Sequence, residues 1–241
     1  MRRRTLTELA NNPDLISGIY NYCDRWCERC PLTSRCLVYA TEQEDNDLFE
    51  NHDLRNEAFW KKLDAIFLET REMIDEWAGN TCIDLTEPKE ESENGHKRRR
   101  QLVDNHPLTR AGKKYANAAT DWFRELDQSD CENTTLEDAR EVIHWYQYQI
   151  AVKTIRALSG RREELEEDPK DSDGSAKVAM IGIDRSIAAW RMMQLSLPER
   201  EESIVPLILQ LERLRRRLEH GFPEARSFVR PGFDEKNGGH G

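Results

Sequence analysis

The chain has 241 residues, of which 46 are acidic and 36 are basic, so its formal net charge at pH 7 is −10. Six Cys, 12 Gly and 9 Pro are too few for a disulfide scaffold or a fibrous chain. No apolar run approaches the roughly 20 residues of a membrane-spanning helix, and residues 1–14 lack the apolar core of a secretory signal. We therefore expect a cytoplasmic protein with no membrane partner, and the acidic surface argues against nonspecific nucleic-acid binding.

Residues 1–50 differ in composition from the rest, because they contain four of the six Cys and end in the acidic stretch Glu42–Asp47. We interpret them as an N-terminal Cys-rich metal-binding module. Residues 51–228 are interpreted as an α-helical bundle, and residues 229–241 as a flexible C-terminal tail.

The first helix of the bundle is predicted from about Asp53 to Gly79, where glycine is a typical C-terminal stop. Residues spaced by three or four positions predict one buried face: Phe59, Leu63, Ile66, Thr70, Met73 and Trp77. After it, residues 87–106 mix acidic and basic blocks without an apolar period, which predicts a solvated linker.

Four further helices follow in the predicted order: 107–126, 134–159, 175–194 and 196–221. Thr134 and Glu137 stand at capping-box spacing, and Pro206 predicts a kink in the last helix. A second charged segment, 161–174, is predicted to be a linker. No segment favours a strand, so the predicted fold class is all-α, a bundle of about five helices with an N-terminal Cys-rich metal-binding loop.

Four thiols within 14 positions are the strongest chemical signal of the sequence. They follow the spacing C-x3-C-x2-C-x5-C and are Cys23, Cys27, Cys30 and Cys36. In a reducing compartment, such a cluster favours a metal site over disulfides, and thiolates select zinc or iron–sulfur centres. Structural zinc usually takes two separated Cys pairs, whereas ligands in one contiguous loop are more usual for a [4Fe–4S] cluster. We therefore predict a [4Fe–4S] cluster on these four thiols, with Zn²⁺ as the alternative.

The segment Cys27–Cys36 resembles the last three ligands of the [4Fe–4S] loop in helix-hairpin-helix DNA glycosylases of the endonuclease III type. That family has the spacing C-x6-C-x2-C-x5-C, often with Cys-Pro where this chain has Cys30-Pro31. The first gap here is x3, so Cys23 is included as the fourth thiol because of its proximity. The resemblance implies the cofactor but no activity, since no Gly-rich hairpin, no catalytic Asp or Lys in matching context and no basic net charge accompany it.

Two features of radical-SAM enzymes also occur in this loop. Their cluster motif C-x3-C-x2-C matches the first three thiols, and C-x2-C-x5-C occurs in their auxiliary-cluster domains. However, the chain has no strands for their β/α barrel, and a fourth thiol would close the iron position that those enzymes leave open.

The residues between the thiols allow two interpretations each. Arg25, Arg29 and Arg35 either offset the negative charge of a four-thiolate site or point to solvent. Trp26 and Tyr22 either shield the site from water or anchor the loop on the bundle. The two remaining thiols are predicted to be small buried hydrophobes: Cys82 and Cys131.

A second candidate site lies in the bundle, where Glu141 and His144 have the E-x-x-H spacing of ferritin-like di-iron proteins. A full site needs a second such motif, which the sequence lacks, although Glu69, Glu72 or Asp184 could add carboxylates. Asp184 stands in an apolar helix and is predicted to have a partner, as a structural ion pair or, alternatively, in a functional pocket. The polar tips of residues 146–149 fit either a hydrogen-bonded network or a pocket.

The leading hypothesis is an iron–sulfur helical protein with a structural, electron-transfer or redox-sensing role and an unidentified protein or redox partner. The alternative is a zinc-stabilised helical module that binds another protein. A lesser alternative is a degenerate ferritin-like di-iron oxidoreductase. No nucleophile elbow, P-loop or dinucleotide fingerprint points to a reaction or a small-molecule substrate, so whether the protein is an enzyme stays open.

Overall fold

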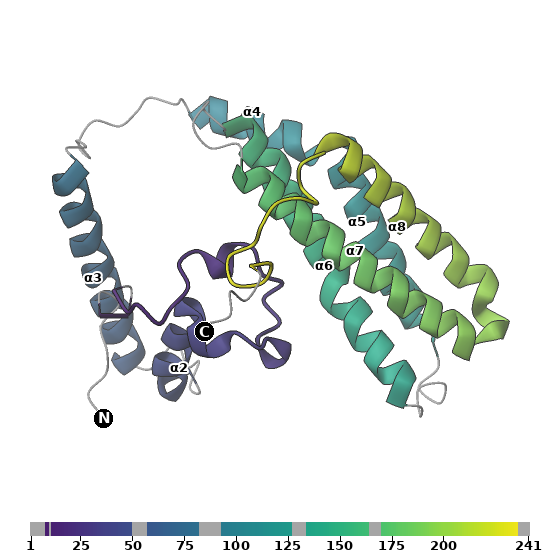
Figure 1. The fold of residues 1–241 in the computed structure, drawn as a ribbon, viewed down its shortest axis with the longest axis horizontal. Coiled ribbons are helices and arrows are strands. Elements are labelled where there is room, and N and C mark those ends of the chain that lie inside the picture. The colour runs from purple at the N-terminus through teal and green to yellow at the C-terminus, as the bar shows by residue number, and fades with distance from the viewer. Residues whose placement is uncertain are drawn as a thin grey trace, which may run out of the picture. The chain divides into compact units, whose positions relative to one another are not determined.

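The computed structural model describes residues 8–9, 11–49, 57–81, 93–126, 134–163 and 170–235. It divides the chain into an N-terminal unit, residues 1–20 and 27–91, and a helical unit, residues 21–26 and 92–241. The described residues contain seven α-helices, labelled α2–α8, and no strand (Figure 1). The all-α prediction is therefore confirmed, with two more helices than the five expected.

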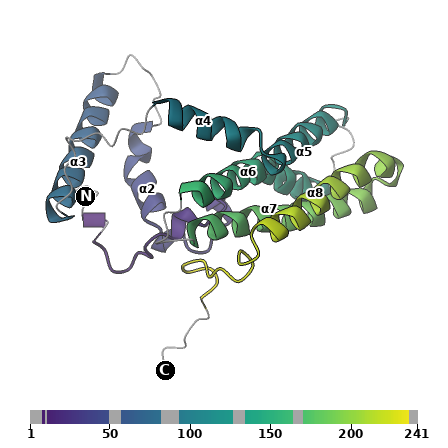
Figure 2. The same ribbon diagram turned by 90° about the horizontal axis from the view of Figure 1, so that it is seen from above.

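A four-helix bundle forms the body of the helical unit. Its helices are α5 (Pro107–Arg124), α6 (Thr134–Glu163), α7 (Lys170–Ser196) and α8 (Glu201–Gly221). Each of the four packs against two of the others, so that α6 lies between α5 and α7, and α8 closes the ring (Figures 1 and 2). α6 and α7 are the longest pair and share the most extensive contact.

Local signals explain where these helices begin. His106 is the N-cap of α5: its Nδ1 accepts a hydrogen bond from the Leu108 N–H (3.2 Å), and Pro107 occupies the first turn. α6 begins at Thr134, as predicted. The last helix differs from its prediction, because Pro198–Arg200 forms a 3₁₀ turn and α8 begins at Glu201.

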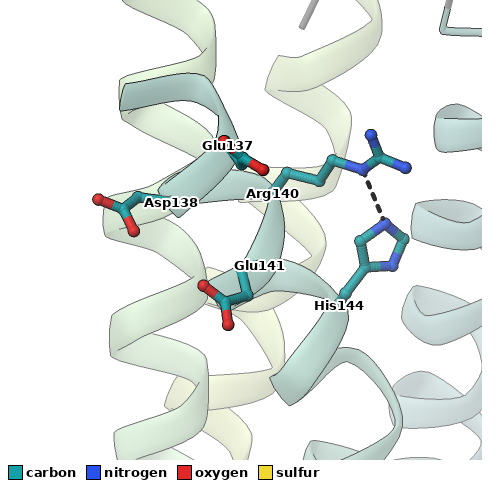
Figure 3. A pocket seen from close by; sticks show the side chains of 5 residues that line it. All are labelled: Glu137, Asp138, Arg140, Glu141 and His144. Atoms are coloured by element: carbon teal, nitrogen blue, oxygen red, sulfur yellow. Dashed lines mark hydrogen bonds between the residues drawn. The ribbon is translucent and has the colours of Figure 1, made fainter. Parts of the chain in front are cut away.

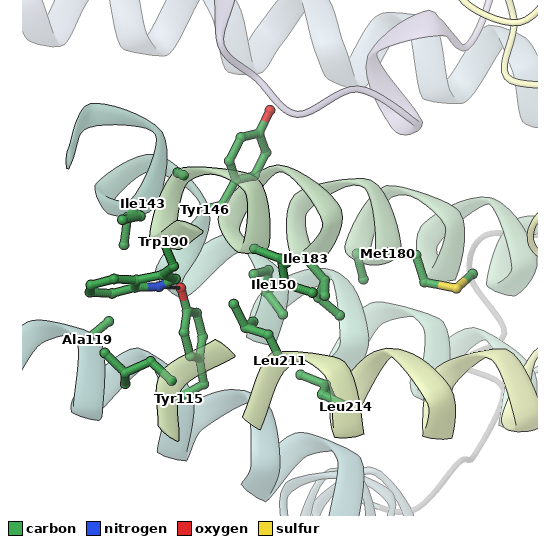
Figure 4. Close-up of a cluster of buried hydrophobic side chains, with 14 of the residues drawn as sticks. Tyr115, Ala119, Ile143, Tyr146, Ile150, Met180, Ile183, Trp190, Leu211 and Leu214 are labelled. Carbon is green, nitrogen blue, oxygen red and sulfur yellow. Dashed lines mark hydrogen bonds between the residues drawn. The ribbon is translucent and has the colours of Figure 1, made fainter. Parts of the chain in front are cut away.

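The core of the bundle is built around one buried polar contact between large aromatic residues. The Trp190 indole N–H donates to the Tyr115 hydroxyl (2.9 Å), and both side chains are fully buried. Burial raises the pKa of Tyr115 to about 12, so the hydroxyl stays neutral. Buried apolar side chains from α6, α7 and α8 continue the core along the bundle from this pair (Figure 4): Ile143, Ile150, Met180, Ile183, Leu211 and Leu214. This satisfied polar pair fixes α5 against α7.

Glycines let α6 approach its neighbours closely. A Cβ on Gly182 of α7 would lie 2.9 Å from the Tyr146 ring of α6. A Cβ on Gly112 of α5 would lie 3.1 Å from the Cα of Ala151, also on α6. Because such separations are shorter than ordinary contacts, side chains at these two positions would push the helices apart.

The predicted linkers are partly helical. α4 spans Glu93–Asp104, inside the segment 87–106, and packs against α6 and α5. Likewise, α6 continues to Glu163 and α7 begins at Lys170, which shortens the predicted linker 161–174 from both ends. The physical reason is that Glu, Lys and Arg favour helix even without an apolar period, and Val103 of α4 is buried.

The N-terminal unit contains α2 (Leu37–Phe49) and α3 (Glu57–Thr81). The Ile16 N–H donates to the Arg35 carbonyl (2.9 Å), and the Arg35 guanidinium donates to the Asp14 carbonyl (3.2 Å), which ties the chain start to the turn before α2. The sequence assigned α3 to the bundle, whereas the structure groups it with the N-terminal segment.

The predicted burial of one face of α3 needs a correction. Trp77 is 55% exposed and Thr70 is exposed, while Met73 is half-buried. The buried residue among the described side chains of α3 is Ala78. The apolar period forms the helix as predicted, but no described part of the N-terminal unit covers Trp77.

None of the helices in the described ranges is both long and apolar enough to cross a membrane.

Candidate functional site

The cysteine loop is the segment 23–36, which contains the four thiols. Asp24, near its start, makes hydrogen bonds to two helices of the bundle. Its carboxylate Oδ2 accepts hydrogen bonds from the Tyr146 hydroxyl (2.5 Å) and from Arg185 Nη1 (2.5 Å). Its backbone carbonyl accepts from the Trp145 indole N–H (2.9 Å) and from the Gln149 amide. Tyr146 points its hydroxyl away from the other core side chains (Figure 4). Residues of α6 thus bind both the side chain and the main chain of Asp24, and Arg185 of α7 binds its side chain as well.

Two aromatic residues on either side of Asp24 anchor the same segment. Trp26 is buried and stacks on Trp145, with ring centres 5.0 Å apart and planes at 16°. Tyr22 packs against Phe228, with ring centres 4.7 Å apart, and its hydroxyl donates to Asp171 Oδ1 (2.9 Å). Of the two interpretations of Trp26 and Tyr22, these contacts support anchoring to the helical unit.

The backbone turns sharply between these anchors. Arg25 has φ of 57°, in the left-handed region that a residue with a Cβ adopts only at a cost in energy. Asp24 Oδ1 accepts the N–H of Trp26 (3.2 Å) and closes the turn. The backbone N–H of Arg25 hydrogen-bonds the Cys23 thiol. This strained turn therefore places the backbone N–H of Arg25 beside the Cys23 sulfur.

A buried lysine faces the same thiol. Lys153 of α6 is 8% exposed, and its ammonium donates to the Asn21 carbonyl (3.2 Å). The ion pairs of the described residues do not include Lys153. Burial raises the pKa of the Cys23 thiol, whereas the Arg25 N–H and the charge of Lys153 lower it. Burial also lowers the pKa of Lys153, and the Cys23 charge opposes that shift. The pKa of Cys23 is raised overall, and the charge of Lys153 is one of the effects that would favour a thiolate there.

The other three thiols belong to the N-terminal unit and stand at the ends of short turns. Cys27 begins the 3₁₀ turn Cys27–Arg29, and its carbonyl accepts the N–H of Cys30 (3.1 Å). Cys36 directly precedes α2, and its carbonyl accepts the first helical N–H from Ala40 (3.0 Å). Both turns hold the thiols on well-defined backbone.

The four thiols of the loop form no disulfide, and each cysteine is half-buried. Within the ranges that the structure describes, no three His, Cys, Asp or Glu side chains are gathered so that they could hold a metal ion. The predicted metal centre on Cys23, Cys27, Cys30 and Cys36 therefore stays a prediction.

The E-x-x-H pair lies on the outer surface of α6. Glu141 and His144 are both exposed and point in different directions (Figure 3). His144 accepts a hydrogen bond from Arg140 (3.4 Å) and stacks on Phe123, with ring centres 4.4 Å apart. Burial lowers the pKa of His144, and Arg140 adds to that shift. Di-iron bundles point this pair inward, so the geometry does not favour such a site here.

Asp184 has the partners that its position predicts. Its two carboxylate oxygens accept from Arg215 (3.0 Å) and Arg226 (2.8 Å), and Arg226 also binds Glu219 (2.8 Å). These contacts join α7, α8 and the C-terminal segment, which confirms that Asp184 has charged partners, and the same residues also line a surface pocket. Glu72 is exposed, while Cys82, Cys131 and the side chain of Glu69 lie outside the described residues.

Sequence reasoning missed the roles of Asp24, Lys153 and Arg185. Their partners lie more than 120 positions away along the chain, so no periodicity or short motif could reveal them. Comparison of the chain with protein-family models, with curated proteins and with solved structures found no match. The functional argument therefore rests on these residues.

Proposed function

We propose that this protein binds a metal centre through the thiolates of Cys23, Cys27, Cys30 and Cys36, and that the centre is a [4Fe–4S] cluster. The observation that carries the proposal is the spacing C-x3-C-x2-C-x5-C, which places four thiols in one contiguous loop. Three of them flank short turns whose backbone hydrogen bonds define the chain path.

Two neighbours of Cys23 suit it as the fourth ligand, although burial raises the pKa of its thiol and its spacing departs from the glycosylase loop. A ligating thiol must be a thiolate, and a four-thiolate site carries net negative charge. Lys153 brings a buried ammonium to this sulfur, and Arg25 brings a backbone N–H. Hydrogen bonds to ligand sulfur and nearby cations stabilise such a centre.

The residues beside Cys23 would hold this thiol in place. Asp24 fixes the backbone next to Cys23, while Trp26 and Tyr22 pack the segment onto the bundle. A fully thiolate-capped cluster supplies outer-sphere electron transfer or structural support when bound. The proposed role is therefore structural, electron-transferring or redox-sensing, with a protein as the partner.

A second candidate is a zinc-stabilised module that binds another protein. The observation in its favour is the exposed apolar surface of α3, where Phe67, Ile74 and Trp77 face solvent. Four Cys thiolates also suit tetrahedral zinc. A redox-silent metal would favour this candidate.

Six single Cys→Ser variants test the proposal. We expect C23S, C27S, C30S and C36S each to lose iron and acid-labile sulfide, because each removes one ligand. The matched controls C82S and C131S make the same change outside the loop and should keep wild-type iron. Equal iron in all six variants would contradict the assignment of the ligands, and equal loss of helical circular dichroism in all six would indicate general unfolding.

A further inference from the structure

α3 carries an apolar stripe that the N-terminal unit leaves open. Phe67, Ile74 and Trp77 are 63%, 46% and 55% exposed. At 3.6 residues per turn they fall within an arc of about 80° on one side of the helix. Residues 59, 63, 66, 70 and 73 continue the same period in the sequence. Exposed apolar residues in one contiguous stripe mark an interaction site.

The packing of the N-terminal unit does not account for this stripe. Ala78, near the end of α3, is the buried residue among its described side chains. The exposed residues nevertheless repeat at heptad-like spacing, with Phe67 and Ile74 seven positions apart. Such a period over a 25-residue helix of about 37 Å is typical of a seam between two helices.

We propose that α3 pairs with α3 of a second copy of this chain in an antiparallel two-helix seam. The charges beside the stripe select this partner and this direction. Asp64 and Arg71 are exposed, lie on the same flank of the stripe and are seven residues apart. In an antiparallel pair that crosses near Phe67, Asp64 of each copy lies opposite Arg71 of the other. In a parallel pair the same flank of the two helices lies on opposite sides of the seam, so Asp64 and Arg71 would not meet across it.

The present contact of Arg71 does not compete strongly with such pairing. Arg71 meets Asp75 at 3.8 Å, and their side chains are 81% and 61% exposed. An exposed pair one helical turn apart contributes little to stability. The dimer would therefore gain two intermolecular ion pairs, and it would bury the apolar stripe of each copy.

The test is the mass of the full, metal-loaded chain in solution, measured by sedimentation equilibrium over a range of concentrations. We expect a dimer. I74E and W77E place charge in the seam and should give monomers. The control L68E changes a residue that is 60% exposed but about 100° away from Phe67, and it should stay dimeric.

A charge swap tests the direction of the seam. R71D and D64R should each weaken the dimer roughly tenfold or more, because each creates two repulsive pairs. The double variant D64R/R71D should restore wild-type association. A wild-type monomer at tens of micromolar would overturn the proposal, and so would a dimer that I74E and W77E leave intact.

Discussion

At the scale of single residues, Asp24 fixes residues 21–26 on the bundle because it uses its side chain and its main chain together. Three donors reach its carboxylate and two reach its carbonyl. Tyr146 depends on this contact, since burial and then the hydrogen bond to Asp24 raise the pKa of its hydroxyl. A neutral Tyr146 donates while Arg185 supplies the positive charge, so the three groups form one connected network.

Replacement of Asp24 by Ala should release the segment locally. Tyr146 and Arg185 would lose their acceptor, at a cost of about 1–3 kcal/mol, which is roughly 5- to 150-fold in a local opening equilibrium. We expect trypsin to cleave after Arg25 faster by a factor in that range, as measured by mass spectrometry of the fragments. R191A breaks an exposed ion pair with Glu212 and should leave the rate unchanged. An unchanged rate in D24A would contradict the role of Asp24.

Replacement of Lys153 by Met should have different effects on the metal-free and on the metal-bound protein. Met at this position removes a buried ammonium, so the metal-free protein should be at least as stable as wild type in urea. With metal bound, the lost charge should speed metal release to a chelator roughly tenfold. K113M removes an exposed lysine and should change neither quantity. Equal metal release from K153M and wild type would show that Lys153 does not balance the site.

Asp234 provides a test with a defined pH dependence. Hydrogen bonds from Arg230 hold the pKa of this carboxyl well below its usual range, burial opposes them, and Lys177 of α7 lowers it further. The contribution to stability is complete above the unfolded pKa of about 4 and is lost as pH falls towards the folded pKa. D234N should lower the free energy of unfolding by about 1–3 kcal/mol at pH 7. The difference from wild type should shrink below about pH 4, and a constant difference would contradict this account.

At the scale of helices, one glycine of α7 permits the anchoring of the loop. A Cβ on Gly174 would lie 2.3 Å from the Tyr22 ring and 2.8 Å from the Phe228 ring. G174A should therefore cost about 1–3 kcal/mol and lower the thermal midpoint by several degrees. G221A is the matched control in the same unit, since its nearest neighbour, Leu108 Cδ1, would lie at 3.9 Å. Equal midpoints for both variants would mean that Tyr22 does not pack against Gly174.

The sequence predicts the helices better than it predicts their limits. The 3.6-residue period locates α3, α5, α6 and α8, which repeat apolar residues along one face, and the strongly apolar sequence locates α7. It misses α2 and α4, and the charged sequence of α4 needs little burial to be helical. It also predicts Trp77 as buried, since periodicity indicates that a face is apolar but not what covers it.

At the scale of the whole molecule, the sequence identifies the thiols but not the residues that position one of them. Spacing alone singles out the four cysteines. Lys153 and Arg185 look like ordinary charged residues of helices, and Asp24 looks like one acidic residue in a loop. Their roles depend on the folded chain, which brings α6 and α7 to residues 21–26. The candidate site could therefore be named from the sequence, whereas its anchor required the structure.

The central claim is that the cysteine loop holds an iron–sulfur cluster. The most direct test is iron and acid-labile sulfide analysis, with a visible spectrum, on protein purified without oxygen. We predict four irons and four sulfides per chain, and a brown colour that reductant bleaches. One zinc without sulfide would contradict the cluster and favour the zinc-stabilised module, and a protein without any metal would contradict both.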